Sequence, residues 1–286
     1  MTMTTPTALL LAALVAAPAE PPNPWREGGE ASLDAALTGL AGKPLPDRLR
    51  QVSDGFLGTP YGFSPLGEGE GAVPDGDPLF RLDVLDCLTF AEEVMALALS
   101  KDVASAKPML ERIRYRADRP AGPDYAWRNH LMEADWVPSN VQQGFVQDIT
   151  DRVGGRATVD ASMEVSPGHW AGKVGARLAL PASRQVVGRF PLRVLPVKHA
   201  AAKLKGAPSG TLMLLVREAK ADLPTRVSHV AWLFRDKGKV FVRHASSDAR
   251  RVVDEPLERF VARGLRKKQS WPLVGYALFE VRAPSP

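Results

Sequence analysis

The sequence predicts a single α+β domain in which helices come first and strands follow. Apolar residues recur at helical spacing up to about residue 146, and short strand-like runs with turn residues between them dominate afterwards. The two kinds of segment do not alternate, which argues against a βαβ repeat. With 286 residues, 45% hydrophobic and 24% charged, the chain has the composition of a globular protein rather than a disordered or collagen-like one.

The amino terminus has the pattern of an export signal. The first 19 residues carry no charged side chain and contain the apolar run Ala8–Ala17, followed by Ala17-Pro18-Ala19. Such a run is typical of a secretory signal peptide and is too short to span a bilayer. We expect a signal peptide over 1–19, a linker over 20–30 and one domain over 31–286, with a periplasmic or extracellular location and no membrane span in the mature protein. The alternative is an Ala-rich disordered start.

Helices are predicted in five segments of the first half. The spacing of apolar residues predicts helices over 33–40, 45–56 and from Cys87 to Ala98, a short helix over 108–116, and one from Ser139 to Val146. Asp86 is a suitable N-cap for the helix that starts at Cys87. Residues 57–78 form a Gly- and Pro-rich loop, and a loop of this length is usually functional or mobile.

Strands are predicted in six segments of the second half. Residues rich in β-branched and aromatic side chains, bounded by turn residues, predict strands over 157–165, 190–197, 211–217, 228–235, 239–245 and 274–281. The turn around Lys237-Gly238 joins two of them into a hairpin.

Cys87 is the only cysteine in the sequence, which excludes an intramolecular disulfide framework and a cluster of zinc-bound thiolates. A cysteine in the first turn of a helix is placed where the helix dipole favours the thiolate, and the free N–H groups there are suited to an oxyanion hole. The alternative is a small buried residue on an apolar helix. Position alone does not separate the two interpretations.

His229 and His244 lie on the two strands of the predicted hairpin. Side chains alternate along a strand, so a loop of two or four residues puts both imidazoles on one face, and a loop of three separates them. A base oriented by a second polar group is what a cysteine nucleophile requires. A metal site is the rival interpretation, but the sequence contains no HExxH or other compact ligand motif. We therefore expect neither metal nor cofactor.

The charge balance is mildly basic, with 37 Lys and Arg against 32 Asp and Glu. Such an excess favours anionic partners, including cell-envelope polymers. The basic residues are spread widely apart from one cluster at Arg263, Arg266, Lys267 and Lys268, and no zinc-finger or RRM signature is present. We do not expect nucleic-acid binding.

Several motifs together carry a family resemblance. Their order resembles that of the NlpC-type papain-like cysteine peptidases: Gly58-Thr59-Pro60-Tyr61, Asp86-Cys87, Ser209-Gly210-Thr211-Leu212 and His229-Val230-Ala231. A second set is more closely similar to the bacterial family of N-acetylmuramoyl-L-alanine amidase-like proteins: residues 65–70, 83–90, 128–136, 228–230 and 243–247. The resemblance covers roughly residues 45–282. The chain departs from the broader superfamily at Thr211, where an acid usually follows the glycine.

The resemblance implies a papain-like fold, in which the helix that bears the nucleophile packs on an antiparallel sheet. It also implies that Cys87 is the nucleophile, His229 the base and His244 the residue that orients the base, with Tyr61 near the cleft. The polar and aromatic segment from Tyr125 to Asn140 is a candidate substrate-binding wall, in which we assign binding to His130 and Trp136 and core packing to Trp127.

These residues favour an exported cysteine hydrolase that cleaves an amide bond of peptidoglycan through a thioester, either N-acetylmuramoyl-L-alanine or a bond in the stem peptide. Two alternatives stay open. One is an acyltransferase that uses the same residues, and the other is a non-catalytic envelope-binding module in which Cys87 is simply buried. The sequence does not identify the cleaved bond, the oligomeric state or any protein partner.

Overall fold

The computed structural model describes residues 24–266 and 270–284. The expected signal peptide over 1–19 lies outside these ranges, as do Lys267 and Lys268. Residues 24–30, which the sequence predicts as linker, are helical and begin α1 (Pro24–Gly39). The linker prediction is wrong here because Trp25 is buried and donates from Nε1 to the carbonyl oxygen of Val52 at 3.1 Å, which ties this turn to α2 (Leu45–Asp54).

Three further helices follow in the first half: α3 (Cys87–Leu99), α4 (Val103–Arg114) and α5 (Val137–Gln142). Asp86 caps α3 as predicted. Helix α4 begins five residues earlier than predicted because Asp102 forms the same kind of cap, and Pro108 lies inside the helix instead of starting it. Helix α5 is shorter than predicted and ends before Gly144.

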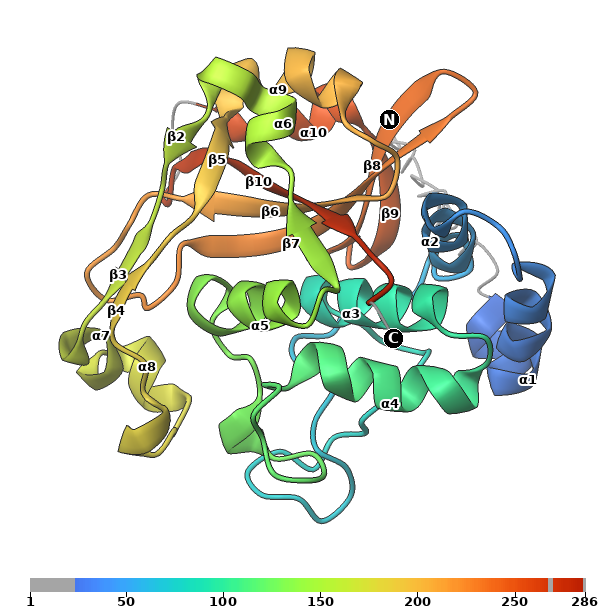
Figure 1. Ribbon diagram of the computed structural model, residues 1–286, viewed down its shortest axis with the longest axis horizontal. Coiled ribbons are helices and arrows are strands. Elements are labelled where there is room, and N and C mark those ends of the chain that lie inside the picture. Colours follow the sequence, from blue (N-terminus) through green and yellow to red (C-terminus); the bar gives the residue numbers. More distant parts are fainter. Residues whose placement is uncertain (1–23, 267–269, 285–286) are drawn as a thin grey trace, which may run out of the picture.

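An antiparallel sheet occupies the second half (Figure 1). Within the described residues its strand order is β2-β5-β10-β6-β7-β8-β9, and β1 also pairs with β10. The strands are β1 (Val146–Asp148), β2 (Val159–Asp160), β5 (Arg193–Pro196), β6 (Thr211–Arg217), β7 (Val227–Asp236), β8 (Lys239–Ser246), β9 (Arg251–Pro256) and β10 (Leu273–Val281). A separate pair consists of β3 (Met163–Val165) and β4 (Gly188–Phe190). The predicted strands over 157–165 and 190–197 are therefore each interrupted.

The sequence analysis missed several short helices of the second half. These are α6 (Thr150–Gly154), α7 (Pro167–Ala171), α8 (Lys173–Arg177), α9 (Val197–Lys203) and α10 (Leu257–Gly264). Single turns occur at η1 (Tyr125–Trp127), η2 (Met132–Trp136), η3 (Gly155–Ala157), η4 (Ala182–Arg184) and η5 (Leu204–Gly206), of which η2 is a π-helical turn.

The sheet separates two hydrophobic cores, because the side chains of each strand alternate between its faces. On β7, Val230 and Trp232 belong to the core shared with α3, whereas Ala231 and Leu233 belong to the core shared with α10. Figure 1 shows α3, α4 and α5 on one side of the sheet and α6, α9 and α10 on the other. The α+β class and the antiparallel sheet are thus confirmed.

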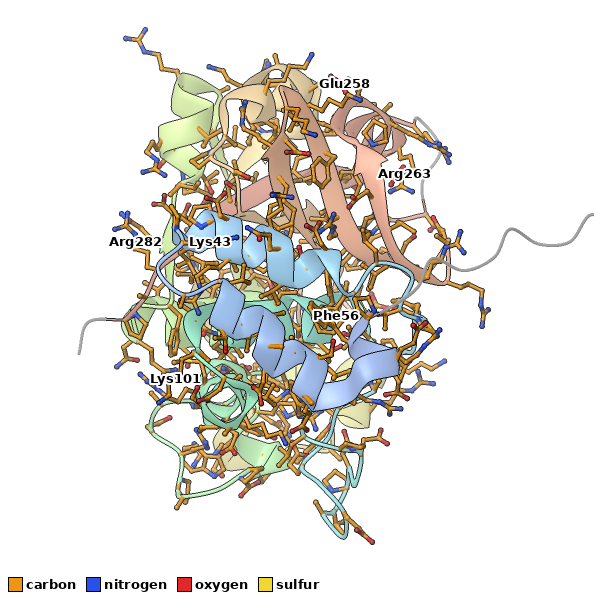
Figure 2. The ribbon with its side chains drawn as sticks, turned by 90° about the vertical axis from the view of Figure 1, so that its right-hand side faces the viewer. Lys43, Phe56, Lys101, Glu258, Arg263 and Arg282 are labelled. Carbon is orange, nitrogen blue, oxygen red and sulfur yellow. The ribbon has the colours of Figure 1, made fainter. Side chains whose placement is uncertain are left out.

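Helix α2 closes one end of this arrangement, and a buried arginine joins it to the sheet. Arg243 of β8 is 2% exposed and donates to the Asp54 carboxylate at 2.5 Å and to both oxygens of Asp254 at 2.7 Å. In Figure 2, α1 and α2 lie in front, with Arg263 of α10 in the upper part of the view and Lys101 in the lower part. Among the described residues, no helix has the length and apolar character needed to cross a membrane.

Candidate active site

The β7–β8 hairpin brings His229 and His244 together. Asp236 pairs with Lys239, so the turn is the two-residue loop Lys237-Gly238, in which both residues have positive φ. His229 Nε2 lies 2.8 Å from His244 Nδ1, and the two rings are perpendicular with centroids 4.9 Å apart. The prediction that an even loop places both imidazoles on one face is confirmed.

A β-bulge sets the face on which His229 lies. The pairing of β6 with β7 shifts between Leu215, opposite His229, and Val216, opposite Val227, so that Ser228 is an extra residue on β7. Both Val227 and Val230 belong to the core on the α3 side. Ser228 and His229 instead line a cavity on the side of α10.

Glu255 of β9 extends the histidine pair into a chain. Its Oε2 lies 3.3 Å from His244 Nε2 and 2.5 Å from an amino group of Arg263, and its Oε1 lies 3.6 Å from Arg259. Both His244 and Glu255 are buried. The sequence analysis missed Glu255, since nothing in the run Val253-Asp254-Glu255 shows which acid faces a histidine.

This chain determines the tautomer of each imidazole. An ionised carboxylate only accepts hydrogen bonds, so His244 donates to Glu255 from Nε2 and its Nδ1 is an acceptor. His229 must then donate from Nε2. Its Nδ1 is left without a proton, and it makes no hydrogen bond within the described residues. The structure therefore leaves one ring nitrogen of His229 able to take up a proton.

Cys87 begins α3, and its sulfur lies beside the strand that carries His229. The β7–β8 ladder ends at Trp232 and Arg243, and the backbone N–H of Val230 beyond it is one of the groups that stabilise the Cys87 thiolate. Val230 directly follows His229 in the sequence. No hydrogen bond joins Cys87 to His229 in the part of the chain that the structure describes. The sulfur thus lies against β7 on the side of α3, whereas His229 and His244 line the cavity on the side of α10.

The cap of α3 uses donors that we expected to be free. Asp86 Oδ1 accepts from the N–H groups of Leu88 at 3.0 Å and Thr89 at 2.8 Å, and Asp86 Oδ2 accepts from the N–H of Ser64. Leu88 and Thr89 are therefore committed to the cap. The N–H of Cys87 itself is left as the donor at the helix start for an oxyanion.

The electrostatics of Cys87 differ from the sequence expectation. Burial raises the pKa of the Cys87 thiol to about 12, and the negative charge of Asp86 contributes in the same direction. The backbone N–H groups at the helix start do lower the Cys87 pKa, as expected, but desolvation outweighs them in this resting arrangement. Burial lowers the pKa of His229 to about 3, with further contributions from His244 and Arg263. At neutral pH the resting pair is a thiol and a neutral imidazole.

Tyr61 lies in the loop before α3, close to the start of that helix. Its backbone N–H donates to the carbonyl of Arg250 at 2.9 Å, and it forms a bridge with Leu85, two residues before Cys87. Burial raises the pKa of the Tyr61 phenol to about 12, and the charges of Cys87 and Asp86 raise it further. The loop before α3 therefore brings a phenol into the electrostatic field of the thiol.

The structure does not bring His130 or Trp136 to this centre. Trp136 is fully buried and donates from Nε1 to Glu92 Oε1 at 2.9 Å, so its assignment to a substrate-binding wall is wrong. His130 is half-buried, with Nε2 2.7 Å from the carbonyl oxygen of Tyr125, and burial lowers its pKa to about 4. A role for His130 in binding stays a prediction.

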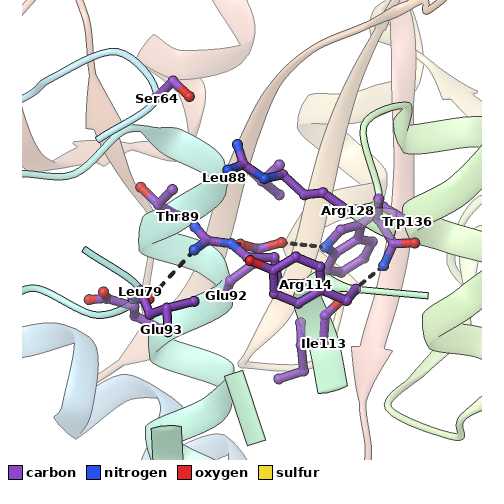
Figure 3. Close-up of polar contacts among 12 residues, drawn as sticks. Ser64, Leu79, Leu88, Thr89, Glu92, Glu93, Ile113, Arg114, Arg128 and Trp136 are labelled. Atoms are coloured by element: carbon purple, nitrogen blue, oxygen red, sulfur yellow. Dashed lines mark hydrogen bonds and ion pairs between the residues drawn. The ribbon is translucent and has the colours of Figure 1, made fainter. Parts of the chain in front are cut away.

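Trp136 belongs to a buried polar network that includes residues of α3 (Figure 3). Glu92 of α3 accepts from Trp136 and lies 3.3 Å from Nε of Arg114 on α4. Its neighbour Glu93 is completely buried. This network joins α3, α4 and η2, and it holds the helix that carries Cys87.

No group of three or more histidine, cysteine or acidic side chains that could hold a metal ion occurs within residues 24–266 and 270–284. The arrangement provides a neutral imidazole, His229, oriented by a second histidine and a carboxylate, and a thiol at the start of the helix that packs on the same sheet.

The comparisons with known proteins cover this whole arrangement. A family model described as AmiA-like, N-acetylmuramoyl-L-alanine amidase-like, matches residues 51–265. The matched range contains α3, the β7–β8 hairpin, β9 and α10. No curated protein matches the chain.

Solved structures share the fold. A Legionella pneumophila protein of the family DUF1460 is 22% identical and has a TM-score of 0.78 over 91% of this chain and 96% of its own. An N-acetylmuramoyl-L-alanine amidase from Bacteroides uniformis is 23% identical, with a TM-score of 0.65 over 83% of this chain and 99% of its own. A putative xylanase from Bacteroides fragilis is 24% identical, with a TM-score of 0.61 over 80% and 99%. At these identities the likeness shows the fold.

Proposed function

Because the chain belongs to the N-acetylmuramoyl-L-alanine amidase-like family, we propose that it is an exported cysteine amidase that hydrolyses an amide bond of peptidoglycan. Cys87 is the nucleophile in this proposal, His229 is the base, and His244 orients His229. The fold is then papain-like of the NlpC type, which the order of the motifs and the packing of α3 on the sheet support. The family's name points to the bond between the muramoyl lactyl group and L-alanine.

One observation supports the proposal above the others: His229 is hydrogen-bonded to His244 at 2.8 Å, and the backbone N–H of the next residue, Val230, stabilises the Cys87 thiolate. The hydrogen-bond chain to Glu255 leaves Nδ1 of His229 as the proton acceptor. The nucleophile of this proposal comes from α3, and the base and the orienting group come from the β7–β8 hairpin, which lies far from α3 in the sequence.

The reaction proceeds in two steps. The Cys87 sulfur attacks the carbonyl carbon of the amide while His229 takes the thiol proton, and the N–H of Cys87 stabilises the oxyanion. The C–N bond then breaks as His229 returns the proton to the departing amine, which leaves a thioester on Cys87. In the second step His229 takes a proton from water as its oxygen attacks the thioester carbon; the C–S bond then breaks, His229 returns the proton to the sulfur, and the acid is released from the free thiol.

The resting protonation states determine when the thiolate forms. The pKa of the thiol is raised to about 12 and that of His229 is lowered to about 3, so no thiolate–imidazolium pair is present beforehand. The proton moves as the sulfur attacks. The reactivity of the sulfur does not come from a preformed thiolate–imidazolium ion pair. It therefore depends on substrate binding, which has to bring the carbonyl carbon to the sulfur.

The test is digestion of N-acetylmuramoyl-L-alanyl-D-glutamate, followed by measurement of new amino groups and by mass spectrometry of the products. We expect the intact protein to release N-acetylmuramic acid and the dipeptide, and the Cys87→Ala and His229→Gln variants to lose at least about a thousandfold in kcat/KM. The matched control is His199→Gln, because His199 is exposed on α9. Unchanged release by Cys87→Ala would remove the proposal, and products that join two fragments would indicate an acyltransferase.

A further inference from the structure

A cavity of about 360 Å³ lies between the sheet and α10, next to the histidine pair. His229 and His244 form part of its wall, and further wall residues come from β6, β10, α10 and the turn after β8. Its size falls within the range of sites that hold small ligands. Besides the two histidines, arginine and tyrosine side chains line the cavity, and the orientation of His229 does not require them.

The charge around this cavity is predominantly positive. Three arginines line it, Arg217 of β6, Arg263 of α10 and Arg266 just beyond α10, and Asp248 is the only acid among the lining residues. Glu255, which lies behind His244, balances part of the charge of Arg263. The positive charges of Arg217 and Arg263 both contribute to lowering the pKa of His229, so they act electrostatically on a group that lines the cavity. Such a field favours an anionic ligand and disfavours a cationic one.

A buried hydroxyl provides a second, independent observation. Tyr276 of β10 lines the cavity and is 0% exposed, yet its hydroxyl has no hydrogen-bond partner among the described residues. The hydroxyl lies next to Gly264, which lines the same cavity. Leaving a buried O–H without a partner costs about 1–3 kcal/mol, so such groups are usually satisfied by something that binds there.

We propose that this cavity is a subsite for a carboxylate group of the substrate, which accepts hydrogen bonds from Tyr276 and from the arginines of the wall. The inference rests on the proposed function, because it assigns a substrate group to the site next to His229. Arginine pairs with a planar carboxylate through two parallel hydrogen bonds, and a neutral tyrosine supplies a further donor. The peptide part of peptidoglycan carries free carboxylates, whereas its sugars and amides are neutral.

Carboxylate recognition would also hold part of the substrate beside His229. An anion held in the cavity is fixed on the same side of the sheet as His229, beside the ring that moves the proton. Substrates that lack the carboxylate should therefore bind less tightly, and the loss should appear in the dissociation constant even when no reaction takes place.

The experiment is isothermal titration of the Cys87→Ala protein, which does not turn over, with N-acetylmuramoyl-L-alanyl-D-glutamate and with the same compound as its dicarboxamide. We expect the dicarboxylate to bind at least about tenfold more tightly. Tyr276→Phe and Arg217→Gln, each in the Cys87→Ala background, should each reduce this ratio at least about threefold. The matched control is Arg259→Gln, since Arg259 also contacts Glu255 from α10 but is exposed and does not line the cavity.

The outcomes separate the subsite from the amidase activity. Equal binding of the two compounds, no measurable binding of either, or an unchanged ratio in both variants would overturn the subsite. A preserved ratio in Arg259→Gln together with a reduced one in Arg217→Gln supports it, even if Tyr276→Phe fails to fold. If the intact protein releases no amine although the ratio is as expected, the subsite stands and the amidase proposal fails. If amine is released although the two compounds bind equally, the amidase proposal stands and the subsite proposal fails.

Discussion

At the scale of single residues, Glu255 determines which nitrogen of His229 can act as a base. The carboxylate accepts from Nε2 of His244, His244 Nδ1 accepts from His229, and His229 Nδ1 is left without a proton. The effect passes along two hydrogen bonds and needs no contact between Glu255 and the substrate. Glu255 is therefore a positioning residue.

The substitution Glu255→Gln tests this role. A glutamine amide can donate to His244, which would reverse both tautomers and place a proton on Nδ1 of His229. We expect kcat to fall about tenfold to a hundredfold with KM little changed, and the ¹⁵N chemical shifts of both histidines to report the reversed tautomers. The control is Glu258→Gln, because Glu258 is exposed and pairs with Lys205. Wild-type tautomers in Glu255→Gln would contradict the argument.

The sequence is sufficient to propose the residues of the candidate site that have distinctive chemistry, but not the residues that surround them. A lone cysteine behind an N-cap and two histidines on a hairpin stand out, because few other residues can serve as nucleophile and base. Glu255 and Tyr276 do not stand out in the sequence, since their surroundings depend on how β9 and β10 pair with other strands and pack against α10. Trp136 was assigned to a binding wall because the sequence shows no partner for its indole, and the structure provides one in Glu92.

At the scale of elements, two equivalent helix caps have different consequences. Asp86 and Asp102 each accept from the third backbone N–H of their helix in a capping box, with Thr89 and Ser105 in the reciprocal position. Only Asp86 lies next to the sulfur of Cys87. The second largest cause of the raised Cys87 pKa, after burial, is the charge of Asp86.

We therefore expect Asp86→Ala and Asp102→Ala each to lower the free energy of unfolding by about 1 kcal/mol, as loss of an N-cap usually does. Only Asp86→Ala should also lower the pKa of Cys87, because it removes a negative charge that disfavours the thiolate. Denaturant unfolding measures the first effect, and the rate of iodoacetamide alkylation between pH 7 and pH 10 measures the second. An equal gain in alkylation rate in both variants would show that loosening of the fold, rather than the charge, exposes the sulfur.

The elements that the sequence predicted best are those whose pattern is local. Strand β6 has the predicted bounds because Thr211–Arg217 is an apolar run buried on both faces. Strand β9 and helix α10 were not predicted because Arg251–Pro256 and Leu257–Gly264 are rich in charged residues. Strand β9 is stabilised by its pairing with β8, and α10 by the packing of Phe260 on the sheet. The interrupted strands around residues 161 and 191 likewise depend on tertiary pairing that no local pattern records.

At the scale of the whole molecule, the packing of α3 buries the carboxyl of Glu93 with only partial compensation by hydrogen bonds and opposite charges. Glu93 of α3 is 0% exposed, its Oε1 accepts only the backbone N–H of Arg81, and its Oε2 has no partner among the described residues. Burial raises the pKa of Glu93 to about 8, above the ordinary value of 4.5. The folded protein therefore binds a proton that the unfolded chain has already released between these two values.

This difference makes the stability of the whole fold depend on pH. Between about pH 4.5 and pH 8 the folded state holds one more proton at Glu93 than the unfolded state, so the free energy of unfolding should fall as pH rises, by up to about 1.4 kcal/mol per pH unit, and level off above pH 8. Glu93→Gln cannot ionise, so it should be the more stable protein at pH 8, and its advantage should shrink toward pH 5. Urea unfolding of both proteins across pH 5–9 measures this difference. Buried histidines such as His130 shift stability in the opposite direction below about pH 6.5, but they do so equally in both proteins and cancel. The exposed control Glu70→Gln should follow the wild-type curve, and a Glu93→Gln curve parallel to it at every pH would mean that Glu93 is ionised in the folded state.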